Sequence, residues 1–252
     1  MRQLAAKFKL SNGFSHILHP ILVTLLPITI FVLVRLNNVV FIQLALAIIL
    51  LSKWRMFAVR LRYWPANIRA NAVDIIVGFS TVVFMIHTTS SLWQLVWVAI
   101  YATWLIGIKP VSSVLGVSLQ AIVGQLFGLM AIFLEWPAAP LYGLVAATGI
   151  VCYVSARHFF DSFEESYSRL LSYTWGYFAA ALTWLLGHWL MFYGVLSQTT
   201  LLLTVIGYGL ATLYYFDHYD RLSKLLRRQF VFIMLAIVVA VLALSNWSDK
   251  II

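Results

Sequence analysis

The stretch SVLGVSLQAIVGQLFGLMAIFL, residues 113–134, contains no charged side chain and decides the fold class. An α-helix needs about 20 mostly apolar residues to cross the roughly 30 Å hydrocarbon core of a bilayer. This run meets that length, and it lacks the period-two alternation of a strand in a membrane barrel. It therefore predicts a transmembrane α-helix.

Similar runs follow one another along the whole chain. Bounded by charged residues or proline, they occupy residues 17–34, 36–52, 72–90, 92–108, 113–134, 141–156, 173–196, 199–216 and 229–245. The composition agrees, since 63% of the residues are hydrophobic and 10% are charged, whereas soluble domains carry about 25% charged residues. The pattern excludes a soluble globular protein. We expect a single-domain, all-α, polytopic transmembrane bundle of about nine spans.

Positive charge is distributed unevenly between these runs. If nine spans alternate across the membrane, all 17 Lys and Arg residues except Arg35 and Lys250 fall on one side. Because cytoplasmic segments carry an excess of Lys and Arg, this predicts a cytoplasmic N-terminus, an external C-terminus and a location in the cell membrane. The net charge of +9 lies in short gaps between apolar runs. Anionic lipid headgroups are therefore the expected partner, and nucleic acid is not.

Two of the cytoplasmic segments have helical periodicity. Residues 157–173 and 217–228 each place apolar side chains on one side of a helical wheel and charged side chains on the other, which predicts two amphipathic helices. Their acids have basic residues four positions away, as on a solvated salt-bridged surface.

The same two segments leave an enzymatic alternative open. Carboxylates and imidazoles that converge from both could hold Mg²⁺ or Mn²⁺ for chemistry on a lipid phosphate or pyrophosphate. The ligands would be His158, Asp161, Glu164, Glu165, Asp217, His218 and Asp220. Outside this alternative the sequence predicts no cofactor.

One further acid lies at the start of an apolar run. Asn67, Asn71 and Asp74 resemble the Asn/Asp-rich loops of intramembrane prenyltransferases, although only one Asp is present where a repeated DxxxD-type pattern is needed. A local interpretation is favoured, in which Asn71 caps a helix and Asp74 completes the capping box three residues later.

Small and polar side chains mark the interior of the bundle. Small residues at helical spacing allow close approach of neighbouring helices, and the predicted packing residues are Gly116, Gly124, Gly128, Gly176 and Gly187. Polar groups beside them are expected to be buried away from lipid. The candidates for a polar interior path are Gln120, Gln125, Thr183 and His188, of which His188 is an ionisable group placed well inside the run 173–196.

Three classes of function fit these features. The first is a small-solute transporter or permease, or its membrane subunit, because almost the whole chain is predicted to lie in the membrane. The second is the lipid-phosphate enzyme of the cytoplasmic face, and no catalytic residue is identified for it. The third is a non-catalytic membrane subunit that packs against a membrane-protein partner or a second copy of itself. Fold alone does not separate them.

Overall fold

The structure is a computed structural model that describes residues 12–188, 192–193 and 196–244. Within these ranges helices joined by short loops make up the chain, apart from two short paired strands, β1 Phe192–Tyr193 and β2 Leu196–Ser197. The described α-helices are α1 Asn12–Arg35, α2 Val39–Leu51, α3 Trp64–Ile86, α4 Ser91–Thr103, α5 Val114–Glu135, α6 Leu141–Asp161, α7 Ser168–Gly187, α8 Gln198–His218 and α9 Lys224–Ala243. Two 3₁₀ turns, η2 Trp54–Met56 and η3 Leu61–Tyr63, precede α3, and a π-helical segment, η4 Trp104–Ile108, continues α4.

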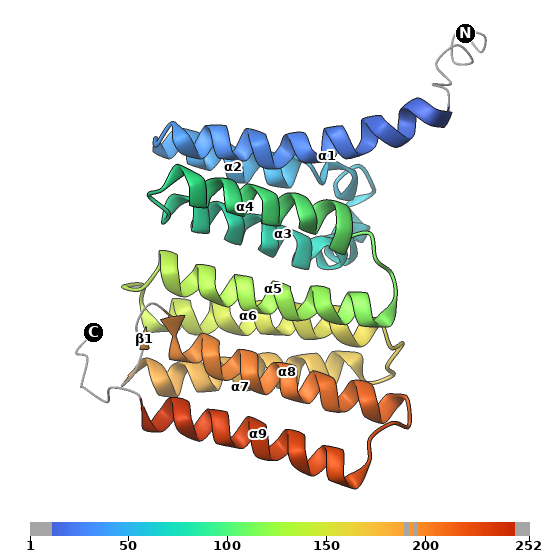
Figure 1. The fold of residues 1–252 in the computed structure, drawn as a ribbon, viewed down its shortest axis with the longest axis vertical. Coiled ribbons are helices and arrows are strands. Elements are labelled where there is room, and N and C mark those ends of the chain that lie inside the picture. Colours follow the sequence, from blue (N-terminus) through green and yellow to red (C-terminus); the bar gives the residue numbers. More distant parts are fainter. Residues whose placement is uncertain (1–11, 189–191, 194–195, 245–252) are drawn as a thin grey trace.

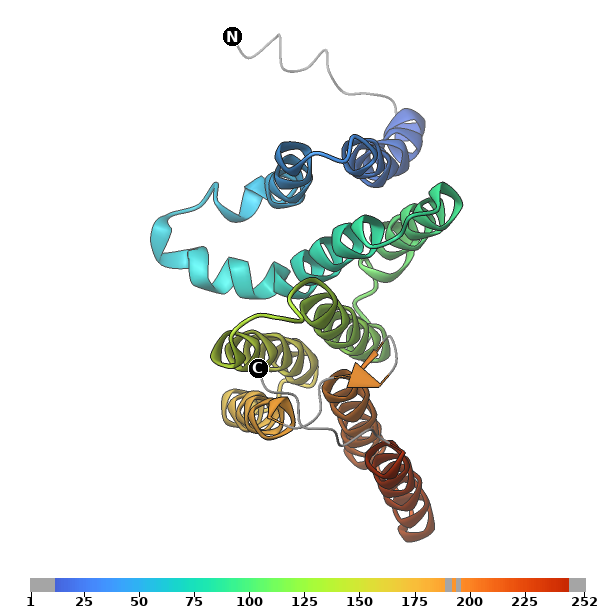
Figure 2. The same cartoon turned by 90° about the vertical axis from the view of Figure 1, so that its left-hand side faces the viewer.

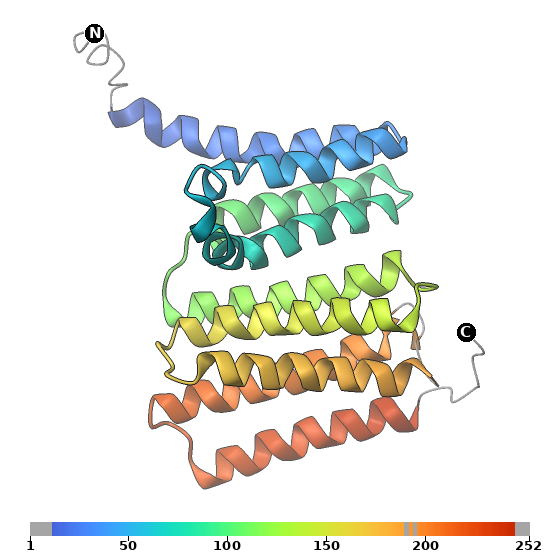
Figure 3. The same ribbon diagram turned by 180° about the vertical axis from the view of Figure 1, so that it is seen from behind.

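The helices lie side by side and are stacked along the longest axis of the molecule, from α1 to α9 (Figure 1). They form two layers. Helices α1, α4, α5 and α8 are nearer the viewer in Figure 1, and α2, α3, α6 and α7 are nearer when the molecule is seen from behind (Figure 3). Viewed along the helices, α8 and α9 extend as a pair away from α6 and α7 (Figure 2).

Successive helices run in opposite directions, so the loops 52–63, 109–113, 162–167 and 219–223 gather at the same end of the bundle (Figure 1). We call it the basic end, because its loops carry Lys53, Arg55, Arg60, Arg62, Lys109 and Arg221. The predicted N-terminal charges Arg2, Lys7 and Lys9 lie outside the described residues.

Several of the helices are long and apolar enough to cross a membrane. Among the described residues six helical stretches meet this standard: 61–86, 91–108, 114–135, 141–161, 198–218 and 224–243. Helix α2 is apolar but has only 13 residues, and α7 is not among the six. The all-helical, multi-pass character expected of a membrane-embedded protein is therefore present.

The bounds of the two predicted amphipathic helices need correction. The amphipathic helix predicted over 157–173 is divided, because α6 ends at Asp161 and α7 begins at Ser168, with Glu164 in the left-handed region (φ 53°). The helix predicted over 217–228 is likewise interrupted after His218 by a turn in which Asp220 has φ 53°. A left-handed residue terminates an α-helix.

The capping box predicted at Asn71 is also wrong. Helix α3 begins seven residues earlier, at Trp64, with a proline in its first turn. Proline suits this position because its fixed φ is helical and its missing N–H would have no partner in the helix. Asn71 and Asp74 therefore lie inside the helix, where Asn71 donates to the Asn67 carbonyl at 2.9 Å.

We call α1–α4 the first half of the bundle and α5–α9 the second half. The predicted glycine faces account for the close packing of α5 and α7. A Cβ atom at Gly124 would lie 2.7 Å from Val73 of α3, and one at Gly128 would lie 2.7 Å from Ile76 of α3. A Cβ at Gly176 would meet the backbone oxygen of Gly149 in α6 at 3.0 Å. Helix α5 thus packs on α3 and α6, and α7 packs on α6.

Gly116 and Gly187 have smaller roles. A Cβ at Gly116 would overlap Val111, in the loop that precedes its own helix, and one at Gly187 would overlap Leu141 at the start of α6. Both positions keep a helix end close to a neighbouring segment.

Candidate functional site

Gln125 joins three helices in the middle of the second half of the bundle. From α5, its Nε2 donates to the Leu203 carbonyl of α8 at 3.1 Å, and its Oε1 accepts from Trp175 Nε1 of α7 at 2.9 Å. The absence of a side chain at Gly207 makes room, since a Cβ there would lie 2.8 Å from Gln125 Nε2 and 3.0 Å from the Trp175 ring. The predicted interior residue Gln125 is thus buried, and its two hydrogen bonds hold α7 and α8 to α5.

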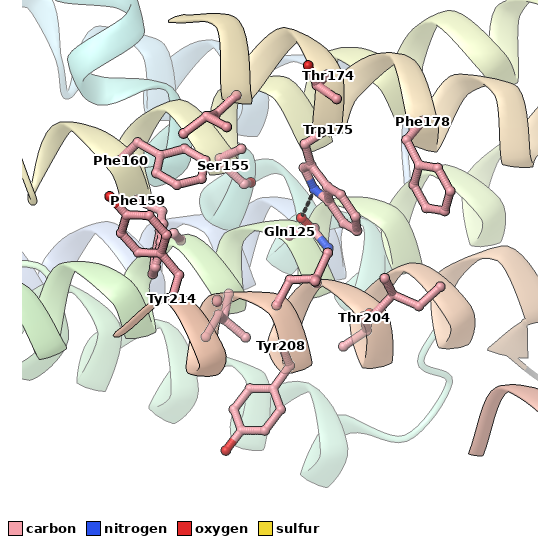
Figure 4. Close-up of a pocket in the computed structure, with 18 residues that line it drawn as sticks. Gln125, Ser155, Phe159, Phe160, Thr174, Trp175, Phe178, Thr204, Tyr208 and Tyr214 are labelled. Carbon is pink, nitrogen blue, oxygen red and sulfur yellow. Dashed lines mark hydrogen bonds between the residues drawn. The ribbon is translucent and has the colours of Figure 1, made fainter. Parts of the chain in front are cut away.

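A cavity of about 580 Å³ lies beside this hydrogen-bonded pair, between α5, α6, α7 and α8 (Figure 4). Its walls are mostly aliphatic and aromatic, and none of its 18 lining side chains is an acid, a base or a histidine. A cavity of this size is typical of sites for small organic molecules.

Two hydroxyl groups on the cavity wall lack hydrogen-bond partners. Ser155 is 2% exposed and its Oγ is unpaired, and Thr204 Oγ1 is likewise buried and unpaired. Hydroxyls inside helices usually donate to a carbonyl one turn earlier, as Ser80 and Thr81 do in α3 at 2.7 and 2.8 Å. A buried hydroxyl without a partner carries a desolvation cost of about 1–3 kcal/mol. Such groups are therefore candidates for contact with a ligand.

Aromatic side chains close the cavity toward the basic end. The ring of Tyr214 lies 5.2 Å from Phe160 and 5.1 Å from Phe163, and Phe163 lies 5.0 Å from the His218 ring. Tyr214 also donates its hydroxyl to Glu165 in the 162–167 loop. This hydrogen bond, together with one from the Tyr167 backbone, lowers the pKa of Glu165.

The side of the cavity between α7 and α8 is more open. Phe178 and Tyr208 both border it, with 41% and 54% of their surface exposed. In Figure 4 the Tyr208 side chain points away from the Gln125–Trp175 pair. The cavity is therefore accessible from the flank of the bundle, the surface that apolar helices present to lipid.

A second polar group lies in the first half of the bundle, near the basic end. Asp74 of α3 is buried; its Oδ2 pairs with Lys53 and, at 2.7 Å, with Lys109, while its Oδ1 accepts from Trp104 Nε1 at 2.8 Å. Trp104 is the first residue of the π-helical segment η4. We call these four residues the Asp74 cluster.

The Asp74 cluster contains one more positive than negative charge. Burial lowers the pKa of Lys53 to about 8 although Asp74 attracts its ammonium group. Burial also works against the charge on Lys109, but the attraction of Asp74 outweighs it and raises the pKa of Lys109. Lys53 is therefore the member of the pair that loses its proton first.

Gln120 links the end of η4 to α6. Its Nε2 lies 2.8 Å from the Ile108 carbonyl and 2.9 Å from the Val111 carbonyl, and its Oε1 lies 3.0 Å from His158 Nε2. These contacts satisfy carbonyls that the end of a helix leaves without a partner. Gln120 is buried as predicted, but it serves a helix end and does not line the cavity.

The other predicted path residues lie elsewhere. Thr183 is buried and donates to the Ala179 carbonyl of its own helix at 2.7 Å. His188 is the exposed residue that caps the C-terminus of α7, with its ring 5.2 Å from that of Trp184. The predicted interior position of His188 is wrong because α7 ends at Gly187, although the sequence stays apolar beyond it.

The residues of the predicted metal site are not brought together. Among the described residues, no three His, Cys, Asp or Glu side chains lie close enough to hold a metal ion. Asp161 pairs with Arg157 at 3.0 Å, as the i,i+4 spacing predicted, while Glu165 contacts Tyr214 and His158 contacts Gln120. The rings of His218 and Phe163 pack together, and no ion pair with Glu164, Asp217 or Asp220 is found among the described residues.

Comparison with known proteins adds no relative: no family model, no curated protein and no solved structure matches this chain.

Proposed function

We propose that this chain is a small-solute transporter or permease of the cell membrane, acting alone or as the membrane subunit of one, and that the cavity beside Gln125 is its solute site. The observation that carries the proposal is a cavity in the middle of the bundle with two unpaired hydroxyls on its wall. Transporters hold their solutes near the bilayer midplane, between helices that can move relative to each other. Helices α7 and α8 suit this role, because they are joined through Gln125 and make few direct contacts.

The proposed topology has nine spans, with the N-terminus in the cytoplasm and the C-terminus outside. Alternating helices and the gathering of the loops 52–63, 109–113, 162–167 and 219–223 at one end support it. In this arrangement the basic end faces anionic headgroups of the cytoplasmic leaflet.

Cysteine labelling tests this topology. In a Cys152→Ser background, an impermeant thiol reagent applied to intact cells should label Ala138→Cys, in the loop at the opposite end. It should leave Arg62→Cys and Arg227→Cys unlabelled until the cells are opened. External labelling of Arg62→Cys would refute the orientation.

The competing classes of function have less support. The enzyme alternative requires carboxylates that converge, and the described residues contain no such group. A role as a subunit has one supporting feature: α9 packs on α8, and none of its side chains is buried. Lipid would cover this helix in a transporter that acts alone, and a membrane-protein partner or second copy would cover it in a complex.

Solute flux tests the proposed function directly. Proteoliposomes are loaded with a small-molecule extract of the producing cells, and mass spectrometry follows which compounds leave. We expect the wild-type protein to deplete at least one compound faster than protein-free vesicles do. Ala211→Phe, which places a ring in the cavity, should abolish the difference, whereas Ala146→Phe on the exposed side of α6 should not. No compound lost above the protein-free rate, at equal incorporation, would refute the proposal.

A further inference from the structure

We infer that the ligand of the cavity is a neutral, largely apolar molecule with a hydroxyl or carbonyl oxygen, and that it enters sideways from the bilayer between α7 and α8. This inference rests on the proposed function for the ligand's role as a transported solute. Its other grounds are the charge, hydrogen-bonding groups and openings of the cavity itself.

The ligand is inferred to be neutral from the residues that line the cavity. No acid, base or histidine is among the side chains around the cavity, so an ionised ligand would find no counter-charge there. Moving an unpaired ion from water or headgroups into such surroundings costs far more than the contacts of a small molecule return. The Asp74 cluster does not supply the missing charge, since none of its four residues lines the cavity.

The hydrogen-bonding group of the ligand follows from the two free hydroxyls. The side-chain oxygen of Gln125 and the carbonyl oxygen of Leu203 each already accept a hydrogen bond. Ser155 Oγ and Thr204 Oγ1, by contrast, have no partner. Each hydroxyl can donate one hydrogen bond and accept others. An alcohol or carbonyl oxygen beside either hydroxyl would satisfy a group that otherwise remains desolvated without compensation.

The direction of access follows from what surrounds the cavity. The rings of Phe159, Phe160 and Tyr214 obstruct the side toward the basic end, and the Tyr214–Glu165 hydrogen bond secures Tyr214 there. Exposed Phe178 and Tyr208 border the flank instead. A molecule dissolved in the hydrocarbon region therefore reaches the cavity without crossing water.

Photolabelling in lipid nanodiscs tests the inference as a binding event, separately from transport. The probes are a hexadecanol and a hexadecanoate that carry the same diazirine in the chain, used at a pH at which the acid is ionised. We expect the alcohol to label peptides of α7 and α8 that line the cavity, with competition by unlabelled hexadecanol. We expect the carboxylate to label these peptides much less.

Removal of the two hydroxyls sharpens the test. Ser155→Ala with Thr204→Val should weaken alcohol labelling at least about fivefold, the factor that one net hydrogen bond represents. The matched control pair, Ser80→Ala with Thr81→Val, removes hydroxyls that are bonded within α3 and should leave labelling unchanged. Ala211→Phe should abolish it.

The possible failures are distinguishable. Equal labelling by alcohol and carboxylate, labelling outside α5–α8, or no effect of Ser155→Ala with Thr204→Val would overturn the inference even if flux is observed. Labelling as expected without flux of any compound would overturn the proposed function and leave the ligand class supported.

Discussion

The Asp74 cluster and the cavity wall bury polar groups in opposite ways. In the first half, Asp74 is charged and both of its oxygens are bound by side chains from other segments, which ties α3 to the 52–63 loop and to η4. In the second half, the cavity wall carries no charge, and Ser155 and Thr204 hold hydroxyls without partners. A fully satisfied cluster holds helices in place, whereas unsatisfied groups beside an empty volume are ready for a ligand. We therefore propose a structural role for the Asp74 cluster and a binding role for the cavity.

The largest effect is expected from breaking the Asp74 cluster. Asp74→Leu leaves the buried ammonium group of Lys53 and the more exposed one of Lys109 without their carboxylate and should destabilise the protein by about 3–5 kcal/mol. Replacing all three ionisable groups, with Lys53→Met and Lys109→Met added, should recover most of this loss, because an apolar set has no unpaired charge. Thermal or denaturant unfolding in detergent provides the measurement. If Asp74→Leu lowers the free energy of unfolding by less than about 1 kcal/mol, the Asp74 cluster does not have the proposed structural role.

A second large effect concerns the close contact between α6 and α7. A Cβ at Gly176 would lie 2.9 Å from Tyr153 Cβ and 3.0 Å from a backbone oxygen, so Gly176→Ala should cost about 1–3 kcal/mol through overpacking. Gly143 in α6 has no atom within 4 Å of the corresponding position, and Gly143→Ala should stabilise by about 0.5–1 kcal/mol. Equal effects of the two substitutions in an unfolding assay would contradict the packing described for α7.

A smaller effect is the pH dependence that Lys53 gives to stability. The pKa of Lys53 is lowered from its ordinary value of 10.5 to about 8, so between these values the unfolded chain binds more protons than the folded one. Stability should therefore rise as pH increases from about 8 to 10. The pKa of Lys109 is raised, so this residue makes stability fall with increasing pH, but only above its ordinary pKa of 10.5. Melting temperatures across this range should rise less in Lys53→Met; an unchanged slope would show that Lys53 is not the titrating group.

The smallest effect on stability is expected at the cavity. Ser155→Ala removes a hydroxyl that has no partner, so it should leave stability unchanged or raise it by no more than about 1 kcal/mol. The control Ser80→Ala removes a bonded hydroxyl and should destabilise by about 1 kcal/mol. If Ser155→Ala is the more destabilising of the two in the same unfolding assay, its hydroxyl has a structural partner and the contrast between the halves fails.

Local sequence features predict the helices of this chain better than they predict its polar sites. Uninterrupted apolar runs indicated the long helices, and the glycine spacing in 113–134 indicated a close-packed α5. The run 173–196 was misleading, because the sequence stays apolar after α7 ends at Gly187, and the prediction therefore placed His188 too deep. The helix ends near 161–168 and 217–224 depend on single residues in the left-handed region, which helical periodicity of the sequence does not predict.

The polar sites depend on residues far apart in the chain. Lys53 and Asp74 are 21 positions apart, and Gln125 meets a carbonyl 78 positions away. One signal could have identified Asp74, because an acid inside a predicted membrane helix needs a partner. Nothing local reveals that Ser155 and Thr204 share a cavity, since their separation is set only by how α6 and α8 pack on α5.

The most direct test of this account is a density map of the protein in lipid, from crystals grown in a lipidic mesophase that contains hexadecanol. We expect elongated density between α7 and α8, with the alcohol oxygen within hydrogen-bonding distance of Ser155 Oγ or Thr204 Oγ1. A map in which α7 and α8 close on each other, with both hydroxyls bonded to helix carbonyls and no density between them, would contradict it.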